Sequence, residues 1–93
     1  MSFNFDLSDK LKAVIKKLSK KDRIRVIILN KKIKEVINND LHSIDRYKNL
    51  RYNLNEYKRV HIDKSFVLLF NVDKQKNHIL FEGLLYHDDV YRR

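Results

Sequence analysis

The chain has no cysteine, no proline and no tryptophan, and Gly83 is its only glycine. Without cysteine it can form no disulfide framework, no thiolate nucleophile and no cysteine-ligated zinc site, which fits a reducing compartment. The absence of proline, of internal repeats and of low-complexity segments leaves no signal for a linker between domains. At 93 residues, the chain is expected to form one domain over residues 1–93, too small to enclose a large cofactor.

Long apolar runs are also missing. No apolar stretch approaches the roughly 18 residues of a membrane-spanning helix, and no basic leader precedes an apolar segment at the N-terminus. Hydrophobic residues still make up 43% of the chain, which is enough to close a core. We therefore expect a globular cytoplasmic protein that does not enter a membrane.

Acidic residues are outnumbered: 12 aspartates and glutamates face 21 lysines and arginines, for a net charge of +9. Residues 9–34 hold eleven basic and two acidic residues, so this segment accounts for the whole excess. Such a segment is typical of a protein that meets a polyanion, and nucleic acid ranks above a membrane surface because the segment lacks tryptophan and phenylalanine. A solvated helix face or an acidic protein partner fits the same charge.

Period-two alternation predicts four short strands, at residues 3–7, 57–62, 66–72 and 78–85. Short polar connections join the last three strands, which are therefore expected to form an antiparallel meander. Gly83 interrupts the last strand, where a lone glycine commonly marks a bulge or a close backbone approach. Residues 41–56 show no clean period and are interpreted as a loop with one turn of helix.

Two helices are expected between the first and second strands. Ser8 suits a helix N-cap, and apolar residues recur at helical spacing from Leu11 to Leu18. The second helix is expected to begin near residue 21 or 22, with a broad apolar face made of Ile24, Ile27, Ile28, Ile33, Val36 and Ile37. Val26 and Leu29 fall partly outside this stripe, so we expect them to contact a partner.

The predicted order is thus β-α-α-β-β-β. It describes an α+β fold in which an N-terminal strand and a two-helix hairpin precede an antiparallel three-strand meander, with both helices packed on one face of the sheet. The opposite face of the sheet is left for another use.

Standard catalytic signatures are absent: the sequence has no glycine-rich phosphate loop, no HExxH motif, no serine elbow and no acidic cluster for magnesium. Of the four histidines, His61 alternates with Arg59 on one face of its strand, whereas Val60 and Ile62 take the core-facing positions. This spacing places two basic side chains next to each other.

The last eight residues, Tyr86-His87-Asp88-Asp89-Val90-Tyr91-Arg92-Arg93, concentrate ionisable groups. His87 and Tyr91 could transfer protons while arginine and lysine stabilise negative charge on phosphorus. This set suffices for RNA cleavage without a metal, because RNA carries its own nucleophile, the 2′-hydroxyl. Structural roles fit the same residues: Tyr91 could fill a core edge, the aspartates could cap a turn, and the arginines could form a frayed tail.

Two stretches together resemble the RelE/ParE toxin superfamily, and within it the RelE-type and YoeB-type messenger RNA interferases of toxin–antitoxin modules. Residues 57–70 resemble the basic hairpin and following strand of that family, and residues 83–91 resemble its ending, Asp-Asp-Val-Tyr or a near variant. The resemblance spans almost the whole chain and implies a RelE-like fold with no cofactor and no metal.

The resemblance also implies roles for individual residues. The catalytic candidates are His87, Tyr91, Arg59 and His61, and the candidates for RNA or phosphate binding are Arg46, Arg51, Lys58, Lys64, Arg92 and Arg93. The antitoxin is expected to contact Val26, Leu29, Lys16 and Lys20. The chain departs from the family at Val67 and Leu85, where arginines are common.

The resemblance implies an endoribonuclease toxin that cleaves messenger RNA in the ribosomal A-site and is neutralised by an acidic or mixed-charge antitoxin of the RelB type. Two alternatives remain at this point: a ParE-like toxin that binds DNA gyrase without cutting RNA, and a small basic RNA-binding module. His87 and Tyr91 favour the nuclease, whereas Val67 in place of an arginine favours the gyrase-binding toxin.

Overall fold

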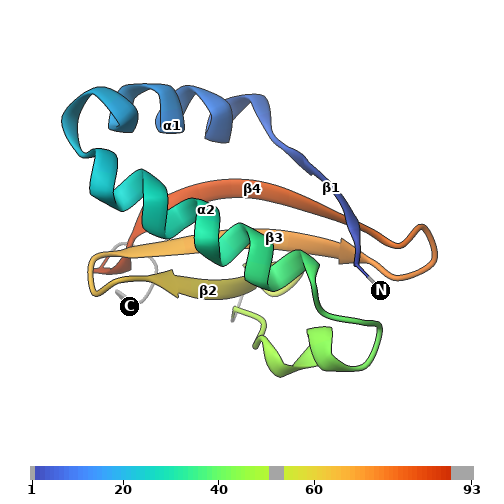
Figure 1. Ribbon diagram of the computed structural model, residues 1–93. Coiled ribbons are helices and arrows are strands. Elements are labelled where there is room, and N and C mark those ends of the chain that lie inside the picture. Colours follow the sequence, from blue (N-terminus) through green and yellow to red (C-terminus); the bar gives the residue numbers. More distant parts are fainter. Residues whose placement is uncertain (1, 51–53, 89–93) are drawn as a thin grey trace.

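A computed structural model describes residues 2–50 and 54–88 of the chain. Its helices and strands follow one another in the predicted order (Figure 1). They are β1 (Asn4–Leu7), α1 (Asp9–Lys21), α2 (Arg23–Ile37), the short 3-10 helix η1 (Ser43–Arg46), β2 (Lys58–Ile62), β3 (Phe66–Asp73) and β4 (His78–Tyr86). None of the helices in this described part is long and apolar enough to cross a membrane.

The four strands form one sheet in the order β1-β4-β3-β2. The predicted meander is confirmed, because β2 pairs antiparallel with β3 and β3 antiparallel with β4. β1, however, lies parallel to β4, from Asn4 beside His78 to Leu7 beside Phe81, so the sheet is mixed rather than antiparallel throughout. The N-terminal strand thereby covers what would otherwise be an open edge of β4.

Two polar side chains define where the helices begin. The Ser8 hydroxyl accepts a hydrogen bond from the Leu11 N–H at 3.0 Å, as expected of an N-cap. Asp22 is the single residue between α1 and α2: its carboxylate accepts from the Arg25 N–H at 3.1 Å, and its own N–H donates to the Leu18 carbonyl. The sharp junction between the two helices therefore needs no glycine.

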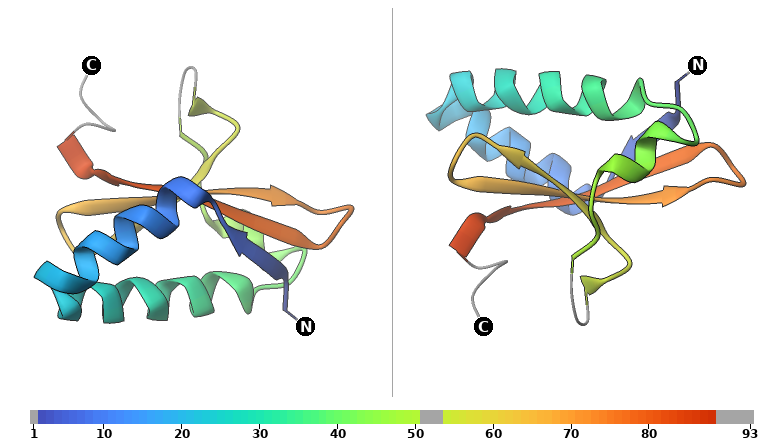
Figure 2. Two further views of the ribbon diagram at one scale, coloured as in Figure 1. Left: turned by 90° about the horizontal axis from the view of Figure 1, so that it is seen from above. Right: turned by 90° about the horizontal axis from the view of Figure 1, so that it is seen from below.

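The main core lies between the two helices and one face of the sheet. Its fully buried side chains include Leu11 of α1, Leu29 and Val36 of α2, and Phe70 and Phe81 of the sheet. A second, smaller cluster lies on the opposite face, where Leu50 packs with Val67 and Leu69. The described residues shortly before β2, among them Leu54 and Tyr57, lie on that side of the sheet, away from α2 (Figure 2). The opposite face is therefore partly covered.

The orientation of α2 differs from the prediction. Leu29 is completely buried and Val26 is half-buried, whereas Ile24 and Ile27 are 72% and 56% exposed. Apolar residues occupy most of the helix surface, so the sequence pattern allowed several rotations about the axis, and packing against the sheet selected the face centred on Leu29 and Ile33. Leu29 cannot contact an antitoxin as predicted, because it lies inside the core.

β4 contains the bulge that its glycine predicted. Leu69 pairs with Gly83 and Phe70 pairs with Phe81, so Glu82 is an extra residue in β4. A Cβ atom on Gly83 would meet nothing within 4 Å, so the structure shows the bulge and not a close backbone approach. Because strand residues alternate between faces, Phe81 and Leu84 can both reach the main core only with this extra residue between them.

Ser8 joins the start of α1 to this bulge. Its hydroxyl donates to the Glu82 carbonyl at 2.6 Å while accepting from Leu11, and its N–H donates to the Phe81 carbonyl at 2.9 Å. Ser8→Ala should lower the free energy of unfolding by about 1 to 3 kcal/mol, because it removes the helix cap and leaves a half-buried carbonyl without its donor. Denaturation in urea measures this loss.

Ser19→Ala is the matched control. The Ser19 hydroxyl donates to the Lys16 carbonyl at 2.8 Å on the exposed side of α1, so its removal should change the free energy of unfolding by less than about 0.5 kcal/mol. Equal stability of the two variants would contradict a role for Ser8 beyond ordinary helix propensity.

Candidate active site

β2 presents Arg59 and His61 on the sheet face opposite the helices. They pair with Leu69 and Val67 of β3, which belong to the second cluster, whereas Ile62 is buried in the main core. The structure therefore confirms the predicted alternation, in which Arg59 and His61 share one face of the strand and the apolar residues face the core. Arg59 is half-buried, and its guanidinium donates to the Asn49 carbonyl at 3.3 Å, which ties β2 to the segment before it.

His87 completes a histidine pair with His61. The centroids of the two imidazole rings are 5.3 Å apart and the ring planes are inclined by 37°. The two rings come from either side of β3, because His61 flanks Val67 on one side and Leu85 flanks it on the other, two residues before His87. The His87 N–H also donates to the Ser65 carbonyl at 2.7 Å, which fixes the start of the C-terminal segment to the β2–β3 turn.

The surroundings of His61 favour its neutral form. Desolvation by the surrounding protein, the neighbouring His87 and the Arg59 guanidinium all lower the pKa of His61 below its ordinary value of about 6.5. Near neutral pH this imidazole is therefore able to accept a proton. His87 Nδ1 lies 3.7 Å from an Asp88 carboxylate oxygen, and the His87 side chain is 41% exposed.

Val67 and Leu85 lie on the same face of the sheet as this pair, between the two histidines in the strand register. Val67 is completely buried and Leu85 packs against the same cluster. The two positions at which the family resemblance implies arginines are therefore filled by apolar side chains of the second cluster. Arg59, from β2, places a positively charged side chain on this same face of the sheet.

Sequence reasoning did not single out Tyr57 and Glu82 as site residues. The Tyr57 hydroxyl donates to a Glu82 carboxylate oxygen at 3.4 Å, and Tyr57 packs on the second cluster, on the face that carries the histidines. Burial raises the pKa of Tyr57, and the nearby Glu82 and Glu56 carboxylates raise it further. The bulge signal at Gly83 could have drawn attention to Glu82, the residue displaced from the regular alternation.

Two of the predicted phosphate-binding residues lie elsewhere. Lys58 pairs with Phe70 and therefore belongs to the helix-facing register; its Nζ donates to the Tyr47 carbonyl at 2.9 Å and to Asn49 Oδ1 at 3.1 Å. Arg46 donates to the Tyr47 hydroxyl at 3.1 Å. Both anchor the segment between α2 and β2, and the structure does not bring them to the histidine pair. Binding of RNA or phosphate by these two residues stays a prediction, at a place separate from the histidine pair.

Lys64 remains near the pair. It is exposed in the turn between β2 and β3, next to Ser65, whose carbonyl holds the His87 N–H. Arg51, Tyr91, Arg92 and Arg93 lie outside the described residues. Within the described part of the chain, no group of three or more histidines and carboxylates could hold a metal ion.

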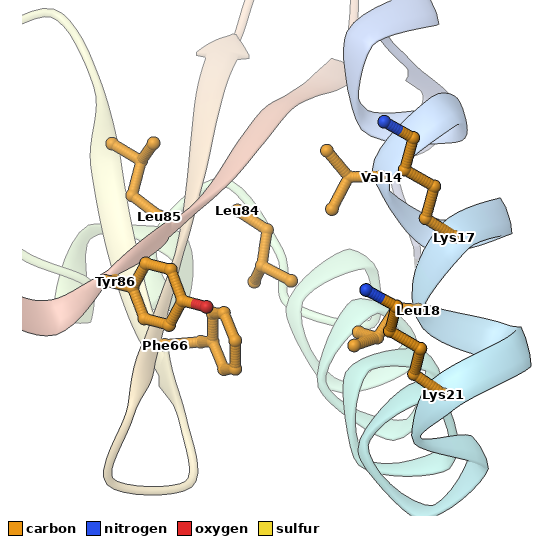
Figure 3. A pocket seen from close by; sticks show the side chains of 8 residues that line it. All are labelled: Val14, Lys17, Leu18, Lys21, Phe66, Leu84, Leu85 and Tyr86. Atoms are coloured by element: carbon orange, nitrogen blue, oxygen red, sulfur yellow. The ribbon is translucent and has the colours of Figure 1, made fainter.

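A groove of about 350 Å³ lies between α1 and the ends of β3 and β4 (Figure 3). It is lined by Val14, Lys17, Leu18, Lys21, Phe66, Leu84, Leu85 and Tyr86. The Tyr86 ring, which stacks on Phe66 at 4.9 Å, is 61% exposed although it is large and mostly apolar. Lys16 and Lys20, predicted for antitoxin binding, are exposed on α1, but the groove is bordered by Lys17 and Lys21.

Comparison with known proteins identifies the family of this chain. No family model matches the chain. Over 91 residues, however, it is 40% identical to the Methanocaldococcus jannaschii protein named "Putative toxin RelE4", a match that covers 98% of this chain and 93% of that protein. The fold is similar to that of the YoeB dimer from Staphylococcus aureus, with a TM-score of 0.71, 26% identity, and coverage of 94% of this chain and 99% of that one.

A heterotetrameric YoeB–YefM toxin–antitoxin complex from Staphylococcus aureus also contains a similar chain. The TM-score is 0.69 and the identity 26%, and the match covers 94% of this chain and 99% of that one. The β-α-α-β-β-β order and the mixed four-strand sheet are thus shared with solved toxins, and the sequence identity extends over nearly the full length of a RelE-type relative. The chain belongs to the RelE family of toxins.

Proposed function

We propose that this chain is the toxin of a toxin–antitoxin pair and that it cleaves RNA by attack of the substrate's own 2′-hydroxyl. The observation that carries this proposal is the pair of imidazoles, His61 and His87, 5.3 Å apart on the sheet face opposite the helices. In this reaction the entering and leaving oxygens are bound to the same phosphorus atom. A base and an acid therefore have to lie close together, and two neighbouring imidazoles meet that requirement.

The pKa of His61, below its ordinary value, makes it the base of the proposed reaction. His61 takes the proton of the 2′-hydroxyl as the 2′-oxygen bonds to phosphorus. His87 gives a proton to the departing 5′-oxygen, which leaves a 2′,3′-cyclic phosphate and a 5′-hydroxyl. Arg59, and Lys64 in the adjacent turn, would stabilise the negative charge that develops on the phosphoryl oxygens.

The family resemblance extends the proposal to messenger RNA on the ribosome as the substrate and to Tyr91 as a further catalytic residue. A ParE-like toxin that binds DNA gyrase is the second candidate, because the buried Val67 and the partly buried Leu85 stand where the family resemblance implies arginines. The histidine pair favours the nuclease, since a toxin that acts by binding alone needs no coupled acid and base.

Replacement of either imidazole tests the proposed chemistry. His61→Ala and His87→Ala should each lower the single-turnover rate of messenger RNA cleavage on ribosomes by about 10² to 10⁴, because each removes one proton-transfer group. A substrate with 2′-deoxyribose at the cut site should not be cleaved, and EDTA should leave the chemical step intact on RNA already bound.

His42→Ala is the matched control, because His42 is exposed before η1, where its N–H donates to Asp40. Cleavage by the double variant His61→Ala, His87→Ala at the rate of the His42→Ala control would overturn the proposed site. Absence of RNA cleavage by the wild-type chain, together with inhibition of gyrase, would replace the nuclease by the gyrase-binding toxin.

The pH dependence follows from the His61 environment. A base with a lowered pKa stays neutral as the pH falls through 6.5, so the cleavage rate should remain near its maximum there and decline only at lower pH. Arg59→Gln should move the midpoint of this decline upward, toward 6.5, because one positive neighbour is lost. The midpoint should not reach 6.5, because desolvation is a larger cause of the lowered His61 pKa than the Arg59 charge. A wild-type midpoint above 6.5 in the pH–rate profile would contradict His61 as the base.

We further propose that the antitoxin partner occupies the groove between α1 and β4. Lys17 and Lys21 border an apolar surface that includes the exposed Tyr86 ring, and this combination suits an acidic helix with a large apolar side chain. The YoeB–YefM complex is a similar toxin bound to its antitoxin, which supports a partner of this class. Ile24 and Ile27, exposed on α2, offer further apolar contacts in place of the buried Leu29.

Charge reversal at the border of the groove tests this surface. The double variant Lys17→Glu, Lys21→Glu should weaken binding of the antitoxin from the neighbouring reading frame by about tenfold or more, because like charges would then face each other. Calorimetry measures the change. Lys10→Glu, Lys12→Glu makes the same charge change in the first turn of α1, outside the groove, and should have a smaller effect. Equal weakening by the two double variants would mean that only the overall charge matters.

A further inference from the structure

One arginine connects the helices to the turn between β2 and β3, which lies next to the histidine pair. Arg25, in the first turn of α2, donates from Nε to Asp63 Oδ2 at 2.9 Å and from Nη1 to Asp22 Oδ2 at 2.9 Å. Its guanidinium also lies over the Phe66 ring, 4.9 Å from the centroid. The planar group thereby connects the α1–α2 junction, the β2–β3 turn and the first residue of β3.

Asp63 holds the turn in its conformation. It has a φ of 53°, in the left-handed region, and its Oδ1 accepts from the Ser65 N–H at 2.7 Å. The Ser65 hydrogen bond and the Arg25 guanidinium keep the pKa of Asp63 below its ordinary value, so the carboxylate stays charged. One oxygen of Asp63 thus shapes the turn and the other binds the arginine.

The backbones of both histidines are connected to this same turn. His61 lies two residues before Asp63 on β2, and the His87 N–H donates to the Ser65 carbonyl at 2.7 Å. Beneath the turn, Phe66 stacks on Tyr86, the residue before His87, with the ring planes inclined by 27°. A movement of the turn would therefore displace one histidine through its strand and the other through its backbone hydrogen bond.

We propose that Arg25 is a positioning residue for the active site: from the helix side of the sheet it fixes the 63–65 turn and thereby the spacing of His61 and His87. The catalytic consequence rests on the proposed nuclease function, whereas the structural consequence does not. Without Arg25, the Asp22 and Asp63 carboxylates would lose their shared cation and would repel each other, which would drive the turn away from the helix junction.

Three variants separate the parts of this clamp. Arg25→Ala removes it. Arg25→Lys keeps the charge but cannot bind two carboxylates through a planar fork. Asp63→Asn keeps an oxygen that can accept from the Ser65 N–H, and asparagine tolerates the left-handed conformation, so this variant loses the ion pair but keeps the internal hydrogen bond of the turn.

The first measurement is the nuclear Overhauser contact between the ring protons of His61 and His87 in the full-length chain, with circular dichroism as the check on folding. We expect Arg25→Ala and Asp63→Asn to weaken this contact. The second measurement is cleavage of messenger RNA, in which kcat should fall by about 10- to 100-fold in both variants with a much smaller change in KM. Arg25→Lys should recover part of kcat.

Arg23→Ala is the matched control, because it removes an exposed positive charge two residues away on the same helix and should leave both measurements unchanged. A wild-type ring contact and a wild-type kcat in folded Arg25→Ala and Asp63→Asn would overturn the proposal. If the wild-type chain does not cleave RNA, the nuclease function fails, and the ring contact alone then decides whether Arg25 positions the pair. Should Arg25→Ala not fold, Asp63→Asn provides the same test with the helix unchanged.

Discussion

The bulge at Glu82 is the constraint on which the arrangement of the C-terminal half depends, because it reverses the face to which each later residue of β4 points. Phe81 before it and Leu84 after it both reach the main core. Leu85 consequently joins the second cluster, and His87 comes to lie beside His61. Ser8 binds the carbonyl of the bulge residue and caps α1, so one side chain stabilises both the bulge and the helix layer.

The sheet has apolar residues on both faces, so the main core lies on one face and the proposed active site on the other. The two helices cover one face and close the main core against it, whereas the smaller cluster of Leu50, Val67 and Leu69 lies on the other face. The proposed groove for the partner and the proposed active site meet at consecutive residues, Tyr86 and His87. A protein seated in the groove would contact the residue next to the proposed acid, which gives a physical basis for inhibition by a bound partner.

Where the sequence predictions succeeded, the signal was local. Ser8 and Asp22 mark helix starts by the hydrogen bonds that they can make within three residues, and Gly83 marks the bulge. The predictions failed where two solutions satisfy the same pattern. The apolar surface of α2 is so broad that Leu29 could be placed outside or inside the core.

Strand boundaries, helix starts, the excess of positive charge and the alternation of Arg59 with His61 all follow from the order of residues, because each depends on neighbours within about one turn or one strand. The pairing of His61 with His87 has another origin. It needs the register of β2 and β4 on either side of β3, the extra residue in β4 and the Ser65 carbonyl that receives the His87 N–H. These contacts join residues far apart in the chain, and their geometry comes from packing and strand pairing, which no local pattern encodes.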